Sequence, residues 1–136
     1  MVEKRFPAAL NQLEPVQMFV LDQLKDHPYT ERIRAQLDVA VEEIFVNIAH
    51  YAYPKDQPGW AVIRCQVDQD PLRITIQFID WGVPFNPLAK KDADITLSAE
   101  DRQIGGLGIL MVKRSMDGVN YVYENGQDIL TLIKEI

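Results

Sequence analysis

Cysteine, signal-like segments and long apolar runs are all scarce in this sequence. Cys65 is the only cysteine among 136 residues, so a disulfide within the chain cannot form. It lies in an apolar stretch, which favours a small buried side chain over a reactive thiol. The first ten residues lack the apolar core of a secretory signal, and no apolar run reaches the roughly 18 residues that a membrane span requires. We therefore expect a cytoplasmic protein with no membrane partner.

Positive charge is also in short supply. The chain has 14 basic and 20 acidic residues, giving a formal net charge of −6. A surface that binds nucleic-acid backbones or anionic lipids needs an excess of Lys and Arg. The composition thus argues against direct nucleic-acid binding, although a single buried nucleotide pocket needs only local order. Since repeats, low-complexity tracts and linkers are absent too, we predict one domain over residues 1–136.

Two amphipathic helices are expected in the first half, after an extended segment over residues 6–10. Asn11 is the predicted N-cap of the first helix, with Glu14 three residues later as in a capping box, and this helix ends before Pro28. The second helix begins near Thr30 or Glu31. Its apolar positions recur at spacings of three and four, which places them on one face in the core: Ile33, Leu37, Val41, Ile44 and Ile48.

The second half contains mostly strand-like segments. Strands are predicted over residues 60–67, 72–80, 119–123 and 129–133, and a third helix from residues 105–108 to about Met116. Asn125-Gly126 between the last two strands is a strong hairpin signal. Strands and helices do not alternate strictly. We therefore predict an α+β fold, a two-layer sandwich of a mostly antiparallel mixed sheet with about three helices on one face.

Polar residues interrupt the second helix at Glu43 and Asn47. Their spacing of four places both side chains on one helix face, at the edge of the apolar stripe. A carboxylate there can accept a proton from a hydroxyl or a water, and an amide oxygen is a suitable ligand for Mg²⁺. Taken alone, the pair also fits a solvated helix face.

Asp80 lies where the alternation of the preceding strand predicts an apolar side chain. It continues the parity of Ile74, Ile76 and Phe78, so its carboxylate points toward the core and needs hydrogen-bond donors. Such a carboxylate, two residues before Gly82, is suited to accept a hydrogen bond from an exocyclic amine. The alternative is that the strand ends one residue earlier and Asp80 is a turn residue.

A glycine cluster, Gly105-Gly106-Leu107-Gly108, leads directly into the third helix. Glycine lets the backbone approach a ligand closely, and the N-terminus of a helix presents free N–H groups to phosphates. Tight packing of a loop against a helix explains such a cluster equally well.

Taken in order, these three segments resemble the nucleotide site of the GHKL ATPase and kinase superfamily. Glu43–Asn47 resembles its N box, Asp80–Phe85 its G1 box and Gly106–Ile109 its G2 box. The resemblance covers residues from about 10 to the end. Within the superfamily, the segments 41–53 and 105–117 are similar to the small stand-alone anti-sigma-factor serine kinases.

This resemblance implies a Bergerat-type fold that binds ATP with Mg²⁺. It also implies phosphorylation of a serine or threonine on a STAS-domain anti-anti-sigma partner, sequestration of a sigma factor, and a homodimer. Transferred to this chain, Asn47 holds Mg²⁺ and Glu43 acts as general base. Asp80 accepts from the adenine amino group, and Gly82 lies beneath the base.

The same resemblance suggests further roles that the boxes define less sharply. Gly106 and Gly108 line the phosphates, and Thr131 on the last strand is a weaker candidate for an adenine contact. Residues 87–104 form a lid whose charges are Lys90, Lys91 and Arg102. His50 is interpreted as a structural hydrogen-bonding residue, with a catalytic part as the alternative.

Other readings of the same boxes are open. The domain can bind ATP to fix its shape and regulate a partner by sequestration, without transferring phosphate; the presence of Glu43 favours a kinase, because binding alone needs no base. A histidine-kinase ATPase half or a gyrase-like ATPase is disfavoured, since nothing here resembles a phosphoacceptor helix pair or additional domains. A fold that no longer binds nucleotide is disfavoured because all three boxes are present.

Overall fold

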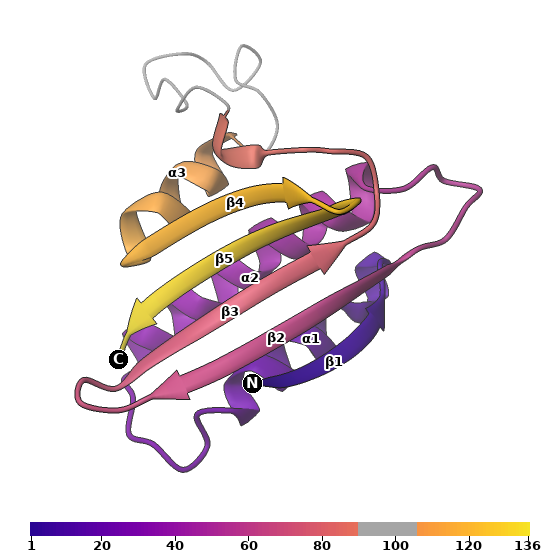
Figure 1. The fold of residues 1–136 in the computed structure, drawn as a ribbon. Helices are drawn as coiled ribbons and strands as arrows, with labels where there is room; N and C mark the ends of the chain where they lie inside the picture. Colours follow the sequence, from indigo (N-terminus) through magenta and orange to yellow (C-terminus); the bar gives the residue numbers. More distant parts are fainter. Residues whose placement is uncertain (90–105) are drawn as a thin grey trace.

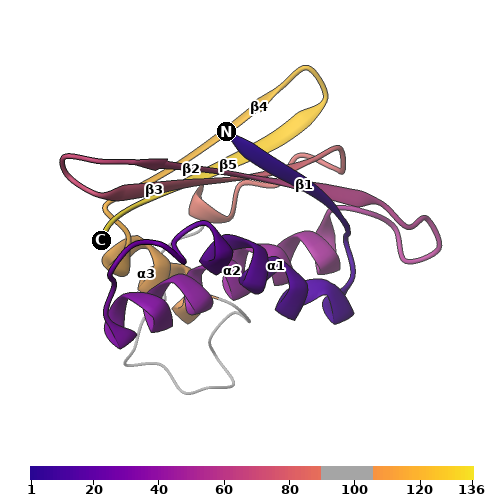
Figure 2. The same ribbon diagram turned by 90° about the horizontal axis from the view of Figure 1, so that it is seen from below.

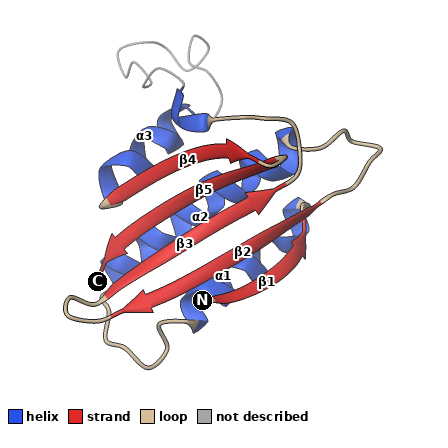
Figure 3. Cartoon of the chain, viewed as in Figure 1, coloured by secondary structure: helices blue, strands red, loops and turns tan. Residues whose placement is uncertain are grey.

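The computed structural model describes residues 1–89 and 106–136, which form one layer of helices against one sheet (Figures 1 and 3). Residues 90–105 lie outside the described residues, and with them most of the lid predicted over residues 87–104. The elements in chain order are β1 (Val2–Pro7), the 3₁₀ turn η1 (Leu10–Gln12), α1 (Leu13–Asp22), α2 (Glu31–Tyr51), β2 (Trp60–Asp68), β3 (Arg73–Asp80), the 3₁₀ turn η2 (Pro87–Ala89), α3 (Gly106–Ser115), β4 (Gly118–Glu124) and β5 (Gln127–Glu135).

The five strands form one sheet in the order β1-β2-β3-β5-β4. Each of the four neighbouring pairs in the described residues is antiparallel. The strand that ends the chain therefore lies inside the sheet, next to β3, and β4 forms the edge. Figure 2 shows the three helices on the same side of this sheet. The predicted α+β two-layer fold is confirmed, with a sheet that is antiparallel throughout the described part.

The long helix α2 starts where the sequence predicts it. The Thr30 hydroxyl oxygen accepts a hydrogen bond from the backbone N–H of Ile33 at 3.2 Å, which caps the first turn. The predicted cap of α1 is wrong. Asn11 lies inside the 3₁₀ turn η1, the N-cap position falls on Gln12, and no side chain caps that end. Because the chain is already helical before Leu13, Asn11 is not at the boundary where a cap acts.

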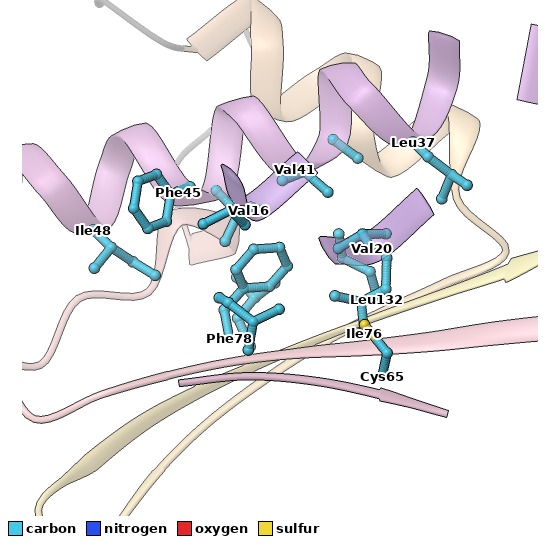
Figure 4. Packing of buried hydrophobic residues seen from close by; sticks show 14 of the residues in the cluster. Val16, Val20, Leu37, Val41, Phe45, Ile48, Cys65, Ile76, Phe78 and Leu132 are labelled. Atoms are coloured by element: carbon cyan, nitrogen blue, oxygen red, sulfur yellow. The ribbon is translucent and has the colours of Figure 1, made fainter. Parts of the chain in front are cut away.

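The core lies between α1, α2 and the helix-facing side of the sheet (Figure 4). The predicted stripe of α2 is buried from Leu37 to Ile48, and it packs over apolar side chains that alternate along β2 and β3. Cys65 is among these and is 1% exposed, as expected for a core side chain. Each fully buried aliphatic side chain of this kind contributes about 2 kcal/mol to folding. The core thereby fixes how α2 lies across β3 and β5.

The closing hairpin has the predicted turn. Asn125 and Gly126 have φ of 53° and 77°, so both central residues adopt the left-handed conformation that a tight hairpin of this type needs. This turn sets the register of β4 on β5. Within the part of the chain that the structure describes, no helix is both long enough and apolar enough to span a membrane.

Candidate functional site

Glu43 lies in α2 and contacts the beginning of α3. A Cβ built on Gly108 would lie 2.1 Å from the Glu43 carboxyl carbon, so this carboxyl fills the space that a side chain would take. Burial, with a smaller contribution from neighbouring Glu42, raises the pKa of Glu43 above its usual value. The fold thus places a half-buried carboxylate against the first turn of a helix whose N–H groups are not used within that helix.

Asn47 lies one turn after Glu43 and lines a small cavity between α2 and the sheet. Asp80 lines the same cavity, so the structure brings these two predicted residues together. The remaining walls are mostly apolar and come from α2, the sheet and the segment after β3: Ile44, Ile48, Phe78, Phe85, Pro87, Tyr121, Asp128 and Leu130. Its volume is about 30 Å³, room for roughly two water molecules.

Asp80 is the last residue of β3 and points toward the core, as its parity predicts. It is 5% exposed, and its Oδ1 accepts a hydrogen bond from the backbone N–H of Gly82 at 2.9 Å. Because β3 continues through this residue, the alternative in which the strand ends earlier is excluded. Directly opposite it in the register of β5 is Asp128, which is also 5% exposed.

The two carboxyls influence each other electrostatically. Burial, followed by the hydrogen bond to Asp128, raises the pKa of Asp80 to about 7, although the Gly82 N–H acts in the opposite direction. Asp128 Oδ1 accepts hydrogen bonds from the Phe85 N–H at 3.1 Å and from the Tyr121 hydroxyl. The neighbouring Asp128 carboxyl thus favours the protonated form of Asp80.

Gly82 packs against the end of α2. A Cβ on Gly82 would lie 2.0 Å from the backbone oxygen of Ala52, and the next residue, Val83, donates its N–H to that same oxygen at 2.9 Å. Tyr53 reinforces the junction, because its hydroxyl donates to the Trp60 carbonyl at 2.6 Å and accepts from the Trp81 N–H at 2.9 Å. This glycine therefore has a packing role beside the one predicted for it beneath a base.

Several predicted residues do not join the cavity. Thr131 alternates with the buried side chains of β5, and its hydroxyl accepts a hydrogen bond from the Gln77 side chain at 3.4 Å, so the structure does not bring it to this cavity. His50 is exposed near the end of α2, with its ring 6.0 Å from that of Tyr51. Gly106 is the first residue of α3. Lys90, Lys91 and Arg102 lie outside the described residues.

Sequence reasoning missed Asp128 and its partner Tyr121. The signal was available, because Asp128 has the parity of Leu130 and Leu132, both buried. The argument that singled out Asp80 applies here unchanged. What the sequence lacked was the register that sets Asp80 opposite Asp128.

The donor and acceptor groups fit a nucleotide with magnesium, whereas the cavity itself fits only part of one. A buried carboxyl pair with an unpartnered oxygen, Asp128 Oδ2, suits a polar ring edge. Within residues 1–89 and 106–136 no cluster of three or more His, Cys, Asp or Glu could hold a metal ion. Asn47 thus fits Mg²⁺ only if phosphates and waters complete the shell.

Curated relatives of similar sequence are named as kinases. The chain is 26% identical over 98 residues to the serine-protein kinase RsbW of Listeria monocytogenes, an alignment covering 69% of this chain and 61% of that protein. It is 25% identical over 104 residues to the serine/threonine-protein kinase BtrW of Bordetella bronchiseptica, covering 76% and 72%. The chain thus spans less than two thirds of the length of its Listeria relative.

A solved structure and a family model also match this chain. A crystal structure of the RsbU and RsbW domains of a Mycobacterium tuberculosis protein superposes with a TM-score of 0.66 at 15% identity, covering 99% of this chain and 32% of that one. The model of the histidine kinase-like ATPase domain matches residues 6–134, nearly the whole chain. By fold and by sequence, the chain belongs to the histidine kinase-like ATPase domain family.

Proposed function

We propose that this chain is an Mg-ATP-dependent serine/threonine protein kinase of the anti-sigma-factor type. Its substrate would be a hydroxyl on a STAS-domain anti-anti-sigma partner, and it would also sequester a sigma factor, as a homodimer. The names of the Listeria and Bordetella relatives support the kinase class. The observation that carries the proposal is the contact between the Glu43 carboxyl and Gly108 at the start of α3.

Each residue of the site has a part in this reaction. Asp80, in the wall of the cavity, accepts from the exocyclic amine of the base, and Gly82 supports the base from the end of α2. Asn47 offers its amide oxygen to Mg²⁺. The backbone at Gly106 and Gly108 approaches the phosphates at the N-terminus of α3, where the helix dipole favours negative charge.

Glu43 acts on the incoming hydroxyl. The serine or threonine oxygen forms a bond to the terminal phosphorus of ATP, the bond from that phosphorus to ADP breaks, and Glu43 accepts the hydroxyl proton. The raised pKa of Glu43 improves it as a base, because a carboxylate with a higher pKa holds a proton more firmly. Bound ATP would supply the phosphoryl group, and its Mg²⁺, held by Asn47, would offset the negative charge on the phosphates.

The first test is thermal unfolding with and without ATP, in magnesium and then in a chelator. ATP at about 100 times its dissociation constant should stabilise the fold by roughly 2.7 kcal/mol. We expect a shift that depends on magnesium and that Asp80→Asn reduces. If millimolar ATP shifts the midpoint in neither condition, the proposed function is wrong.

The second test separates binding from transfer. Glu43→Gln keeps the shape of the side chain but removes the base, so we expect the ATP-dependent stabilisation to persist and radioactive phosphate transfer to a purified STAS-domain protein to fall by about a hundredfold or more. Glu42→Gln is the matched control, since Glu42 is the exposed neighbour on the same helix. Equal loss of binding and transfer in Glu43→Gln would remove Glu43 from the role of base. ATP binding with partner sequestration but no transfer by the wild type would instead favour the purely regulatory module.

A further inference from the structure

The wall of the cavity contains a second buried acid beside Asp80. Asp128 lies opposite Asp80 in the register of β3 and β5, and each side chain is 5% exposed. Both line the same cavity. Among the described residues that line it there is no Lys, Arg or His that could pair with either acid. A ligand group that enters this cavity therefore meets two neighbouring carboxyls.

The hydrogen bonds of Asp128 identify it as an acceptor. Its Oδ1 accepts from the Phe85 N–H at 3.1 Å and from the Tyr121 hydroxyl, and donors of this kind favour the ionised form of a carboxyl. The other oxygen, Oδ2, is buried and has no hydrogen-bond partner among the described residues. A buried acceptor without a donor is unfavourable, and a ligand N–H that pairs with it removes this cost.

The size of the cavity suits a small polar group. Its volume of about 30 Å³ holds roughly two water molecules, and an amino group is about as large as one. The exocyclic amine of a flat base has two N–H groups that point away from each other in the plane of the ring. It can therefore donate to two acceptors at once, and Asp80 and Asp128 are two such acceptors in one wall.

We propose that Asp128 is a second base-recognition residue, whose Oδ2 accepts one N–H of the exocyclic amine of adenine while Asp80 accepts the other. This rests on the proposed function, since it requires ATP in this cavity. The site then recognises both N–H groups of the amine. A base with a carbonyl oxygen at this position would place a third acceptor against two carboxylates, and a site whose buried polar groups are left unpaired discriminates strongly.

The change Asp128→Asn should alter which base the site prefers. The Phe85 N–H and the Tyr121 hydroxyl both donate at the Oδ1 position, so the oxygen of the Asn amide should take that position and its NH₂ group that of Oδ2. A donor then lies where the wild type has an acceptor. This donor suits the carbonyl oxygen of inosine, whose N1–H can in turn donate to Asp80.

The test measures affinities by calorimetry at pH 8 with Mg²⁺. The ligands are ATP, inosine triphosphate and purine riboside triphosphate, which has hydrogen in place of the amino group. We expect the wild type to bind ATP about a hundredfold more tightly than the purine riboside analogue, because two hydrogen bonds to charged acceptors are lost. In Asp128→Leu this preference should fall to about tenfold, since Asp80 alone remains.

The second variant and a control complete the test. In Asp128→Asn the preference for ATP over inosine triphosphate should fall at least tenfold relative to the wild type. Glu124→Gln, at an exposed carboxylate of the closing hairpin, is the matched control and should leave both preferences unchanged. Near-UV circular dichroism checks that each variant is folded. If Asp128→Leu does not fold, Asp128→Asn, which keeps the shape of the side chain, decides the test.

The outcomes separate this inference from the proposed function. An unchanged preference for the amine in Asp128→Leu, or an unchanged preference for ATP over inosine triphosphate in Asp128→Asn, overturns the inference and leaves ATP binding in place. Equal binding of ATP and purine riboside triphosphate by the wild type overturns it as well, because neither acid then contacts the amine. No ATP binding by the wild type overturns both the proposed function and this inference.

Discussion

Gly82 and Gly108 contact different parts of α2 and the residue after it, and neither leaves room for a Cβ. At Gly82 the atom in the way is the backbone oxygen of Ala52, whereas at Gly108 it is the carboxyl tip of Glu43. A helix backbone held in the core cannot move away, but the end of a glutamate side chain can. The space beside Gly82 is therefore set by the fold, while the space beside Gly108 is set by the position of one side chain.

The largest effect on stability is expected from Gly82→Ala. Its new methyl group would overlap the Ala52 carbonyl, so either the end of α2 or the segment after β3 must shift. Overpacking of this kind costs about 3 kcal/mol in the free energy of unfolding, which denaturation in urea measures. Gly126→Ala is the control: nothing lies within 4 Å of its Cβ position, and only its φ of 77° opposes the change. If Gly82→Ala lost no more stability than the roughly 1–2 kcal/mol expected for Gly126→Ala, the junction between the end of α2 and the segment after β3 would not be rigid.

The buried carboxyls of Asp80 and Asp128 predict how stability depends on pH. Asp80 has a pKa of about 7 in the folded protein against 3.8 as its ordinary value. Between these two values the folded state binds more protons than the unfolded state. The contribution of Asp80 to the free energy of unfolding is therefore fully present below about pH 4 and is lost as the pH rises to about 7.

Replacing Asp128 by Asn isolates this contribution. The Asn amide cannot repel Asp80 and can donate a hydrogen bond to it. We therefore expect the free energy of unfolding of Asp128→Asn, relative to that of the wild type, to increase by about 1 kcal/mol as the pH rises from 5 to 8. Urea denaturation of both proteins at pH 5 and at pH 8 measures this difference in stability. The contributions of the ordinary surface carboxyls cancel, because both proteins share them. A stability difference that does not change with pH would mean that the two acids do not interact in the folded state.

Sequence periodicity was sufficient for Asp80 but not for its partner. Alternation along a strand says which face a side chain takes, and it placed Asp80 among the buried residues of β3. Pairing between strands distant in sequence is not contained in that alternation, which is why Asp128 was missed although it lies opposite Asp80. The fold class was accessible because it depends on the order and period of whole segments. The Asn11 cap failed because it depended on where a helix begins to within a residue or two.

The contact between Glu43 and Gly108 was beyond the sequence for a different reason. Both residues were singled out, one as a base and one as part of a phosphate loop, from patterns about 65 residues apart. Their contact depends on how α3 packs on α2, which neither local pattern contains. Helix packing, more than helix identity, is what turns two separate motifs into one site.

The smallest effect on stability, with a large effect on activity, is expected from Gly108→Ala. The methyl group displaces the Glu43 carboxyl, which can turn toward solvent, and alanine favours the helix over glycine by about 1 kcal/mol. The free energy of unfolding should thus change by no more than about 1 kcal/mol, and ATP should still stabilise the fold. Phosphate transfer should fall to about the level of Glu43→Gln, because the base is displaced instead of removed. In the double variant the two losses should not add, as is usual for groups that act as a unit. Additive losses would show that Gly108 serves the phosphates directly, independently of where it leaves Glu43.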